Sequence, residues 1–182
     1  MRVLVACEFS GRVRDAFRAR GHDAYSVDLL PTEKPGKHIQ ADVRNLLSDA
    51  WDLLIAFPPC TYLSKAGARW WPGNEPGQEQ ALELVRLLMN APIPRIAVEN
   101  PVGAISTQIC KPSQIVHPYW FGDAYAKKTC LWLKYLPPLR STGVRPVPDS
   151  EYIVYMPGGR DRARNRSRTP NGLALAMAQQ WG

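Results

Sequence analysis

Short apolar runs separated by polar turns dominate the first two-thirds of the chain. Such runs lie at 3–7, 24–27, 53–56 and 94–98. A short apolar run flanked by turn residues is typical of a strand buried on both faces of a parallel sheet. We therefore predict strands at these four places, with further strands at 127–133 and 152–155.

Apolar residues at helical spacing follow or precede these runs. Val13, Ala16 and Phe17 share one face of a predicted helix. The leucine-rich segment 80–89 predicts a second helix, and Pro76, shortly before it, is at a position that the first turn of a helix tolerates. An alanine-rich helix is predicted at 173–181. Strands that alternate with helices favour an α/β fold with a doubly wound, mostly parallel sheet. With 182 residues and 45% hydrophobic content, the chain fits a single domain over 1–182.

Candidate chemical groups follow four of the predicted strands: Phe9-Ser10-Gly11, Asp28, Cys60 and Glu99. In a parallel sheet these exits share one edge, where ligands bind. Cys60 comes after Pro58 and Pro59, which end a strand, so its thiol is a candidate nucleophile. The alternative is a structural cysteine, because cysteine is among the residues most often buried.

A glycine after the first strand and an acid at the end of the second are the general arrangement for a cofactor that contains a nucleoside. The acid accepts hydrogen bonds from the ribose hydroxyls. Gly11 and Asp28 fit this pattern. Taken singly, Asp28 also fits a turn and Gly11 a helix entry.

The formal charge of +7 and the pI near 9.4 favour a polyanionic partner. The densest basic segment is 160–168, with five arginines in nine residues. Alternating arginines can follow a row of phosphates. The alternative is a solvated loop.

No apolar run is long enough to span a bilayer, and the first residues predict a strand rather than a signal peptide, so we expect a cytoplasmic protein. The cysteines form no C-x-x-C pair, and the three histidines, His22, His38 and His117, show no ligand spacing. We therefore expect reduced thiols and no metal.

Taken in order, these segments resemble the DNA (cytosine-5) methyltransferases over most of the chain. The most specific matches are the Pro-Cys pair at Pro59-Cys60 and the Glu-Asn pair at Glu99-Asn100. Further matches are Phe9-Ser10-Gly11, Asp28, Asp42-Val43, Phe121-Gly122, Lys127-Lys128-Thr129 and Thr169-Pro170-Asn171-Gly172.

The resemblance implies a Rossmann-like fold of the S-adenosylmethionine-dependent methyltransferase type. It implies that Cys60 adds to carbon 6 of cytosine, that Glu99 protonates the ring nitrogen, and that carbon 5 then accepts a methyl group. The cofactor would be S-adenosylmethionine and the partner DNA, as a duplex with the target cytosine flipped out. The implied cofactor site is Phe9, Ser10, Gly11, Asp28, Asp42, Val43 and Pro58, and the implied substrate site is Pro59, Ser64, Asn100, Lys128, Arg166 and Arg168.

Three features depart from the family's pattern. Arg12-Val13-Arg14 stand where further glycines are usual, which restricts the approach of the backbone to the cofactor. Lys127 and Lys128 stand where the family uses arginines to hold the base. The target-recognition region is reduced to 134–168, so we expect short or relaxed sequence specificity, or help from a partner or a dimer.

Two other functions remain open from the residues. The same chemistry could act on RNA, single-stranded DNA or a nucleotide. A catalytically silent relative could instead grip DNA through the arginine run alone. The small size favours a phage or mobile-element enzyme. Trp70 and Trp71 either act near a flipped base or pack on the sheet.

Overall fold

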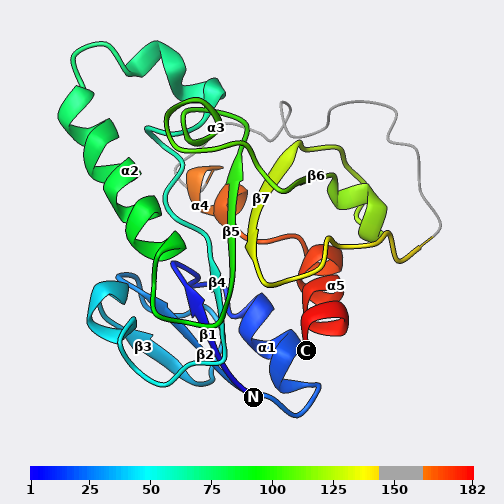
Figure 1. Ribbon diagram of the computed structural model, residues 1–182. Helices are drawn as coiled ribbons and strands as arrows, with labels where there is room; N and C mark the ends of the chain where they lie inside the picture. The colour runs from blue at the N-terminus through cyan, green and yellow to red at the C-terminus, as the bar shows by residue number, and fades with distance from the viewer. Residues whose placement is uncertain (144–161) are drawn as a thin grey trace.

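A twisted sheet forms the centre of the computed structural model, which describes residues 1–143 and 162–182 (Figure 1). Within these residues the sheet has seven strands in the order β3-β2-β1-β4-β5-β7-β6. Neighbours from β3 to β5 pair in parallel, and β7 runs antiparallel between β5 and β6. The predicted fold class is confirmed as a doubly wound α/β fold with a mostly parallel sheet. The strands are β1 (Arg2–Ala6), β2 (Asp23–Asp28), β3 (His38–Gln40), β4 (Leu53–Ala56), β5 (Arg95–Pro101), β6 (Gln114–Val116) and β7 (Thr129–Lys134).

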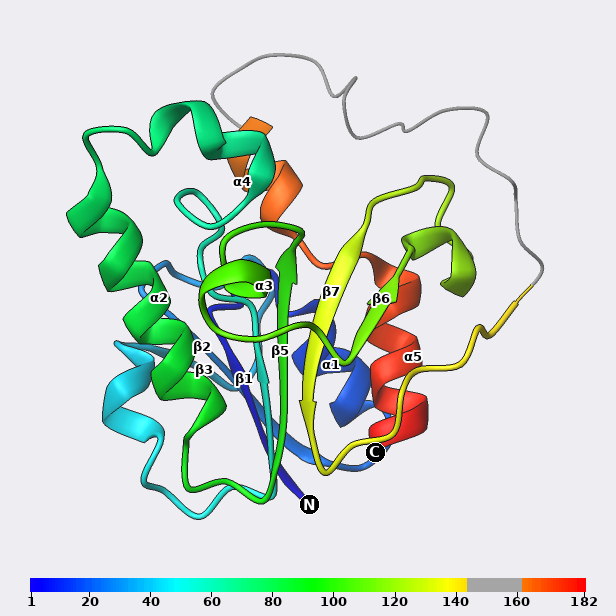
Figure 2. The same cartoon turned by 45° about the horizontal axis from the view of Figure 1, so that its top comes forward.

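Helices cover both faces of the sheet (Figures 1 and 2). On one face lie α1 (Arg12–Arg18) and α5 (Asn171–Trp181), which pack against each other. On the other lie α2 (Glu75–Met89) and α3 (Ile105–Gln108). The arginine-rich α4 (Arg162–Ser167) lies near the carboxyl edge of the sheet. Single 3₁₀ turns complete the described elements: η1 (Val43–Leu46), η2 (Lys65–Trp70) and η3 (Pro118–Phe121).

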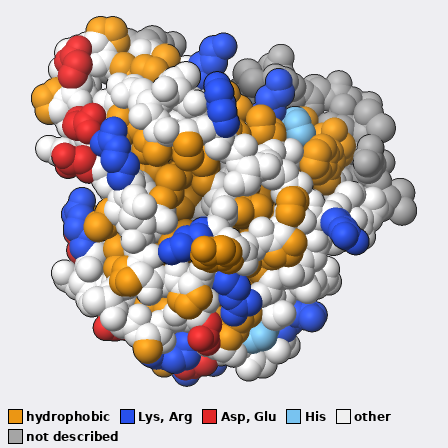
Figure 3. Space-filling model, viewed as in Figure 1, with side chains coloured by type: hydrophobic (Ala, Val, Ile, Leu, Met, Phe, Trp, Pro, Cys, Tyr) orange, Lys and Arg blue, Asp and Glu red, His pale blue; other side chains and the backbone are white. Residues whose placement is uncertain are grey.

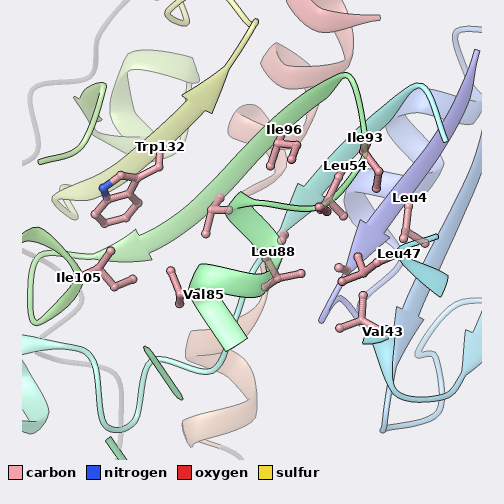
Figure 4. Close-up of a cluster of buried hydrophobic side chains, with 14 of the residues drawn as sticks. Leu4, Val43, Leu47, Leu54, Val85, Leu88, Ile93, Ile96, Ile105 and Trp132 are labelled. Carbon is pink, nitrogen blue, oxygen red and sulfur yellow. The ribbon is translucent and has the colours of Figure 1, made fainter. Parts of the chain in front are cut away.

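Alternate residues of the central strands divide the core into two clusters. Leu54 and Ile96 pack with Leu88 of α2 on one face (Figure 4). Leu53 packs with Met177 of α5 on the other. This alternation is expected for strands buried on both faces. Removing most of a buried leucine side chain costs about 2–5 kcal/mol of stability. The tryptophans expected in the core follow the same division: Trp132 joins the first cluster, Trp181 the second, and the partly buried Trp120 packs against the second.

The predicted elements agree with the structure at β1, β2, β4, α1, α2 and α5, and β7 is displaced by one or two residues from its predicted range. One correction concerns Glu99 and Asn100, which were expected just beyond a strand. They lie inside β5, because β7 pairs with β5 past the end of the parallel ladder, at Glu99–Leu131 and Asn100–Cys130. The predicted strand at 152–155 lies outside the described residues. In the described part of the chain, no helix is long and apolar enough to cross a bilayer.

Candidate active site

The register of the sheet brings the predicted strand exits to one edge. Ala6 of β1 is paired with Ala56 of β4, and Ala56 with Val98 of β5. The next residues along the chain are Cys7, Phe57 and Glu99, which therefore lie side by side at the carboxyl ends of the parallel strand pairs. Asp28 follows Val27, the partner of Ala6 in β2. The convergence predicted from the sequence is confirmed, and the topology produces it.

The loop that carries Cys60 is held by the segment after β5. The buried Asn100 donates from Nδ2 to the carbonyl oxygen of Pro58, at 2.8 Å. Beyond the cysteine, an isolated β-bridge joins Ser64 to Gly103, and Ala104 N donates to Leu63 O at 2.8 Å. Neighbouring backbone thus fixes the loop on both sides of Cys60.

Within this loop the predicted residues differ in exposure. Pro58 and Ser64 are buried, whereas Pro59 and Cys60 are exposed. The carbonyl oxygen of Cys60 accepts from Ser64 N at 2.8 Å, which forms a tight turn. The turn leaves the free thiol at the surface while its backbone is constrained. An exposed thiol on a constrained backbone suits a nucleophile.

Cys60, Glu99 and Lys127 form one electrostatic group. Although Cys60 is an exposed residue, the surrounding protein partly desolvates its thiol and so raises the pKa of this group; Lys127 opposes the shift and Glu99 adds to it. Burial also raises the pKa of the Glu99 carboxyl, and Lys127 again opposes the shift. A carboxyl with a raised pKa can donate a proton near neutral pH. The three side chains therefore combine a thiol, a proton donor and a cation that favours the thiolate.

The cation in this group is Lys127, whereas Lys128 was the predicted substrate residue. Lys128 is exposed and is not among the charges that shift the pKa of Cys60 or Glu99. Lys127 is partly buried and affects both. The sequence offered a signal for Lys127, since it belongs to the same basic pair.

The turn between β1 and α1 contains the predicted Phe9, Ser10 and Gly11. All three are buried, and Gly11 has a φ of 74°, in the left-handed region that favours glycine. The hydroxyl of Ser10 donates to Glu8 Oε1, which also accepts from Arg12 N at 3.2 Å. Glu8 Oε2 is buried without a hydrogen-bond partner in the structure, and burial raises the pKa of this carboxyl. Sequence analysis missed Glu8, whose only signal is its place beside Phe9.

Asp28 and Asp42 lie together beside Cys7. Burial raises the pKa of the Cys7 thiol to about 12, and the charges of Asp28 and Asp42 add to the shift. Asp28 Oδ1 accepts from Leu30 N at 2.9 Å, and Asp42 Oδ1 from Arg44 N at 2.9 Å. Both carboxylates therefore have fixed positions.

The surroundings of these acids suit a nucleoside. Leu29, directly after Asp28, is 70% exposed and offers an apolar surface to a ring. Val43, after Asp42, is buried in the first core cluster. A fixed carboxylate, an exposed apolar side chain and a left-handed glycine are features of a site that binds ribose and an adenine ring.

Arg14 holds the 29–37 loop, which follows Asp28 in the chain. Its side chain is fully buried, forms an ion pair with Asp15 at 2.8 Å and donates to the carbonyl oxygens of Lys34 and Pro35 at 3.1 and 3.3 Å. A Cβ atom on Gly11 would lie 2.5 Å from Arg14 Nη2. The arginine that departs from the family's glycine pattern is thus used within the fold.

The described arginines of the 160–168 run differ in what they contact. Arg168 makes two hydrogen bonds of 2.7 Å to the Glu33 carboxylate, and Arg164 Nε makes one of 2.8 Å. Arg164 also lies 5.5 Å from the Phe9 ring centroid. Arg166 is exposed, and its charge lowers the pKa of Cys60. Phosphate contact by Arg166 and Arg168 stays a prediction, and Arg160 lies outside the described residues.

The predicted closing segment reaches the side of the edge that carries the β1–α1 turn and α1. Arg12 Nη1 donates to Thr169 O at 2.8 Å, and Gly172 N donates to Asp123 Oδ2 at 3.0 Å. Burial, with the charges of Asp123 and Glu99, raises the pKa of Tyr125 to about 12. Sequence analysis did not single out Tyr125 or Asp123, which lie in an irregular segment without a periodic pattern.

Of the two tryptophans in the loop after Cys60, Trp71 is partly buried and packs against the first core cluster. This placement favours the packing alternative for Trp71. The Trp70 side chain is outside the described part of the structure.

Comparison with known proteins adds little to the site. No protein-family model matches the sequence, and no curated protein matches it. Among solved structures, the chain is similar to a crystal structure of a mutant DNMT2 of Spodoptera frugiperda, with 14% sequence identity and a TM-score of 0.43. The match covers 82% of this chain and 56% of that chain, so this chain spans little more than half of its length.

Proposed function

We propose that the protein transfers a methyl group from S-adenosylmethionine to carbon 5 of cytosine in DNA. One observation carries the proposal: an exposed thiol, Cys60, shares the cation Lys127 with a carboxyl of raised pKa, Glu99. This group lies at the same sheet edge as Asp28 and Asp42, the carboxylates beside Cys7. A catalytically silent DNA-binding protein would have no use for such a pair.

The chemistry assigns a step to each group. Carbon 5 of cytosine is a weak nucleophile, so the Cys60 thiolate adds at carbon 6 while Glu99 gives a proton to the ring nitrogen. The resulting enamine would attack the methyl group through carbon 5, with S-adenosylhomocysteine as the leaving group. A water molecule or another base would then take the proton from carbon 5 as the thiolate is eliminated, and the ring nitrogen would return its proton to Glu99. Asn100 keeps the nucleophile in place through its hydrogen bond to Pro58 O.

The chain's own residues fit the cofactor. Asp28 would accept hydrogen bonds from the ribose hydroxyls, and Asp42 would accept one from the adenine amino group. Phe9 and Leu29 would pack on the adenine ring. Gly11 allows close approach of the backbone. The cofactor supplies an electrophilic methyl group.

The test is transfer of labelled methyl from S-adenosylmethionine to mixed-sequence duplex DNA, followed by digestion to nucleosides. We expect label in 5-methylcytosine, and its loss in Cys60→Ala. Cys110→Ala, which removes another exposed thiol, is the matched control and should keep the activity. Label in RNA or single strands instead of duplex DNA would reassign the substrate, and no label in any of them would overturn the proposal.

A trapping experiment tests the covalent step separately. In DNA that carries 5-fluorocytosine, fluorine cannot leave carbon 5 as a proton would, so the adduct should persist. We expect a complex that resists denaturation, requires S-adenosylmethionine and is absent in Cys60→Ala. Methyl transfer to ordinary DNA without any trapped complex would contradict the assigned nucleophile.

A further inference from the structure

Glu33 joins two parts of the edge that are far apart in sequence. Its backbone N donates to Phe9 O at 2.9 Å, in the turn after β1. Its carboxylate accepts from Arg164 and, through both oxygens, from Arg168. We call these three residues the Glu33 cluster. The Glu33 side chain is 17% exposed and that of Arg168 29%, so the two are partly shielded from solvent. Two-point arginine–carboxylate contact fixes orientation as well as distance.

The Glu33 cluster holds the arginine segment at two points. Arg164 belongs to α4 and Arg168 directly follows its last residue, and both guanidinium groups contact the Glu33 carboxylate. Arg166, between them, is exposed, and its charge is the weakest of the influences on the pKa of Cys60, which it lowers. In both ribbon views α4 lies beside the segment that follows β4 (Figures 1 and 2).

Two further contacts hold the same segment. The Arg164 guanidinium lies 5.5 Å from the Phe9 ring centroid, within the range of a cation–π contact. Arg12 Nη1 donates to Thr169 O at 2.8 Å. These contacts are to Phe9 in the β1–α1 turn, to Arg12 at the start of α1 and to Glu33 in the 29–37 loop. They hold the segment from the side of the sheet edge that carries the turn after β1.

We propose that Glu33 is a positioning residue, whose carboxylate holds α4 so that Arg166 stands near Cys60. The role of Cys60 as nucleophile rests on the proposed function, but the coupling between Glu33 and the thiol does not. The charged groups that act on this thiol are Lys127, Glu99 and Arg166. Without the Glu33 cluster, α4 would lose its fixed orientation. Arg166 would then move away from the Cys60 thiol, and Lys127 would remain beside it.

The test is the rate of Cys60 alkylation by iodoacetamide across pH, followed on the Cys60 peptide by mass spectrometry. We expect Glu33→Gln to shift the profile to higher pH, with a rate about two- to threefold lower near neutral pH, because a screened cation changes the thiolate fraction by this order. Arg166→Gln should give the same shift. The double variant should add nothing to either single change, since both act through one contact.

Glu79→Gln is the matched control, because it breaks an ion pair of the same kind with Arg86, at 2.6 Å on α2, outside the edge. Arg168→Gln breaks the Glu33 cluster from the other side and should reproduce the shift if Glu33→Gln folds poorly. An unchanged profile in Glu33→Gln, or additive shifts in the double variant, would overturn the inference. Since alkylation needs neither cofactor nor DNA, a failure of methyl transfer would count against the proposed function alone.

Discussion

At the scale of single residues, desolvation by the surrounding protein raises the pKa of both candidate catalytic groups, with opposite consequences for the proposed reaction. It raises the pKa of Glu99, which keeps a proton available for the base, and it raises the pKa of Cys60, which disfavours the reactive thiolate. Activity should therefore rise as pH rises through the pKa of Cys60 and fall as pH rises through that of Glu99. Lys127 opposes both shifts, so it favours the Cys60 thiolate but also favours loss of the Glu99 proton.

Replacing Lys127 tests this balance. In Lys127→Gln the thiolate loses a cation, so the pKa of Cys60 should rise and the pH profile of its alkylation should move up by as much as about one unit. Lys127→Arg should restore most of the profile. Lys128→Gln, which removes the neighbouring exposed charge, serves as the control in this alkylation measurement. Equal shifts from the two glutamine variants would mean that general charge, rather than the position of Lys127, sets the pKa.

The sequence pointed to Cys60 and Glu99 as candidate catalytic residues and to Lys128 of the basic pair. Cys60 and Glu99 could be selected because each comes soon after a clear apolar run. The two lysines precede β7 in an irregular segment, where no periodicity assigns a side chain to either face. Which lysine faces the thiol is decided by the path of the chain there.

At the scale of elements, the Cys60 loop is held in place by β5, the strand beside it. Asn100 holds the loop before Cys60, and Gly103 holds it after, through the bridge to Ser64. The extension of β5 by pairing with β7 brings Asn100 to this position. A strand that pairs in parallel on one side and antiparallel on the other thus supports the loop of its neighbour.

Gly103→Ala should disrupt this support. A Cβ atom at this position would lie 1.8 Å from Leu63 O and 2.9 Å from Ser64 Cα, so the backbone of the Cys60 loop must move. We expect methyl transfer to fall at least about tenfold, since small displacements in an active site are costly, and stability to fall by about 1–3 kcal/mol. Gly143→Ala is the matched control, because no atom of the described residues lies within 4 Å of its added Cβ. Activity assays and thermal unfolding of both variants measure the difference, and wild-type activity in Gly103→Ala would contradict the role of the bridge.

Elements with a strong local pattern were predictable, and those made by distant contacts were not. The apolar runs of β1, β2 and β4 and the spacing of α2 are visible in the sequence. The three-residue strands β3 and β6 are too short to show a pattern. The contacts of the arginine segment depend on Glu33, 131 residues away from Arg164 in sequence, which no local signal reveals.

At the scale of the whole molecule, charge is distributed unevenly around the fold. The exposed Glu75, Glu79 and Glu83 all belong to α2, whereas Lys127 and Arg166 lie at the carboxyl edge of the sheet. On the face shown in Figure 3, acidic side chains lie at the upper left and again near the lower edge, with basic side chains beside both groups and between them. A polyanion should therefore approach the edge that carries Cys60 rather than α2. The predicted target-recognition segment, 134–168, is described only at 134–143 and 162–168.

This distribution gives a prediction for DNA binding. Each phosphate contact contributes a slope of about −0.9 to the dependence of log affinity on log salt concentration. Arg166→Gln should therefore reduce the slope for duplex DNA by about one unit, measured by fluorescence anisotropy over a salt series. Arg86→Gln removes the same charge from α2, where Arg86 is paired with Glu79, and should leave the slope unchanged. Equal reductions in the two variants would mean that DNA responds to net charge alone, whereas a reduction confined to Arg166→Gln would place a phosphate beside the candidate nucleophile.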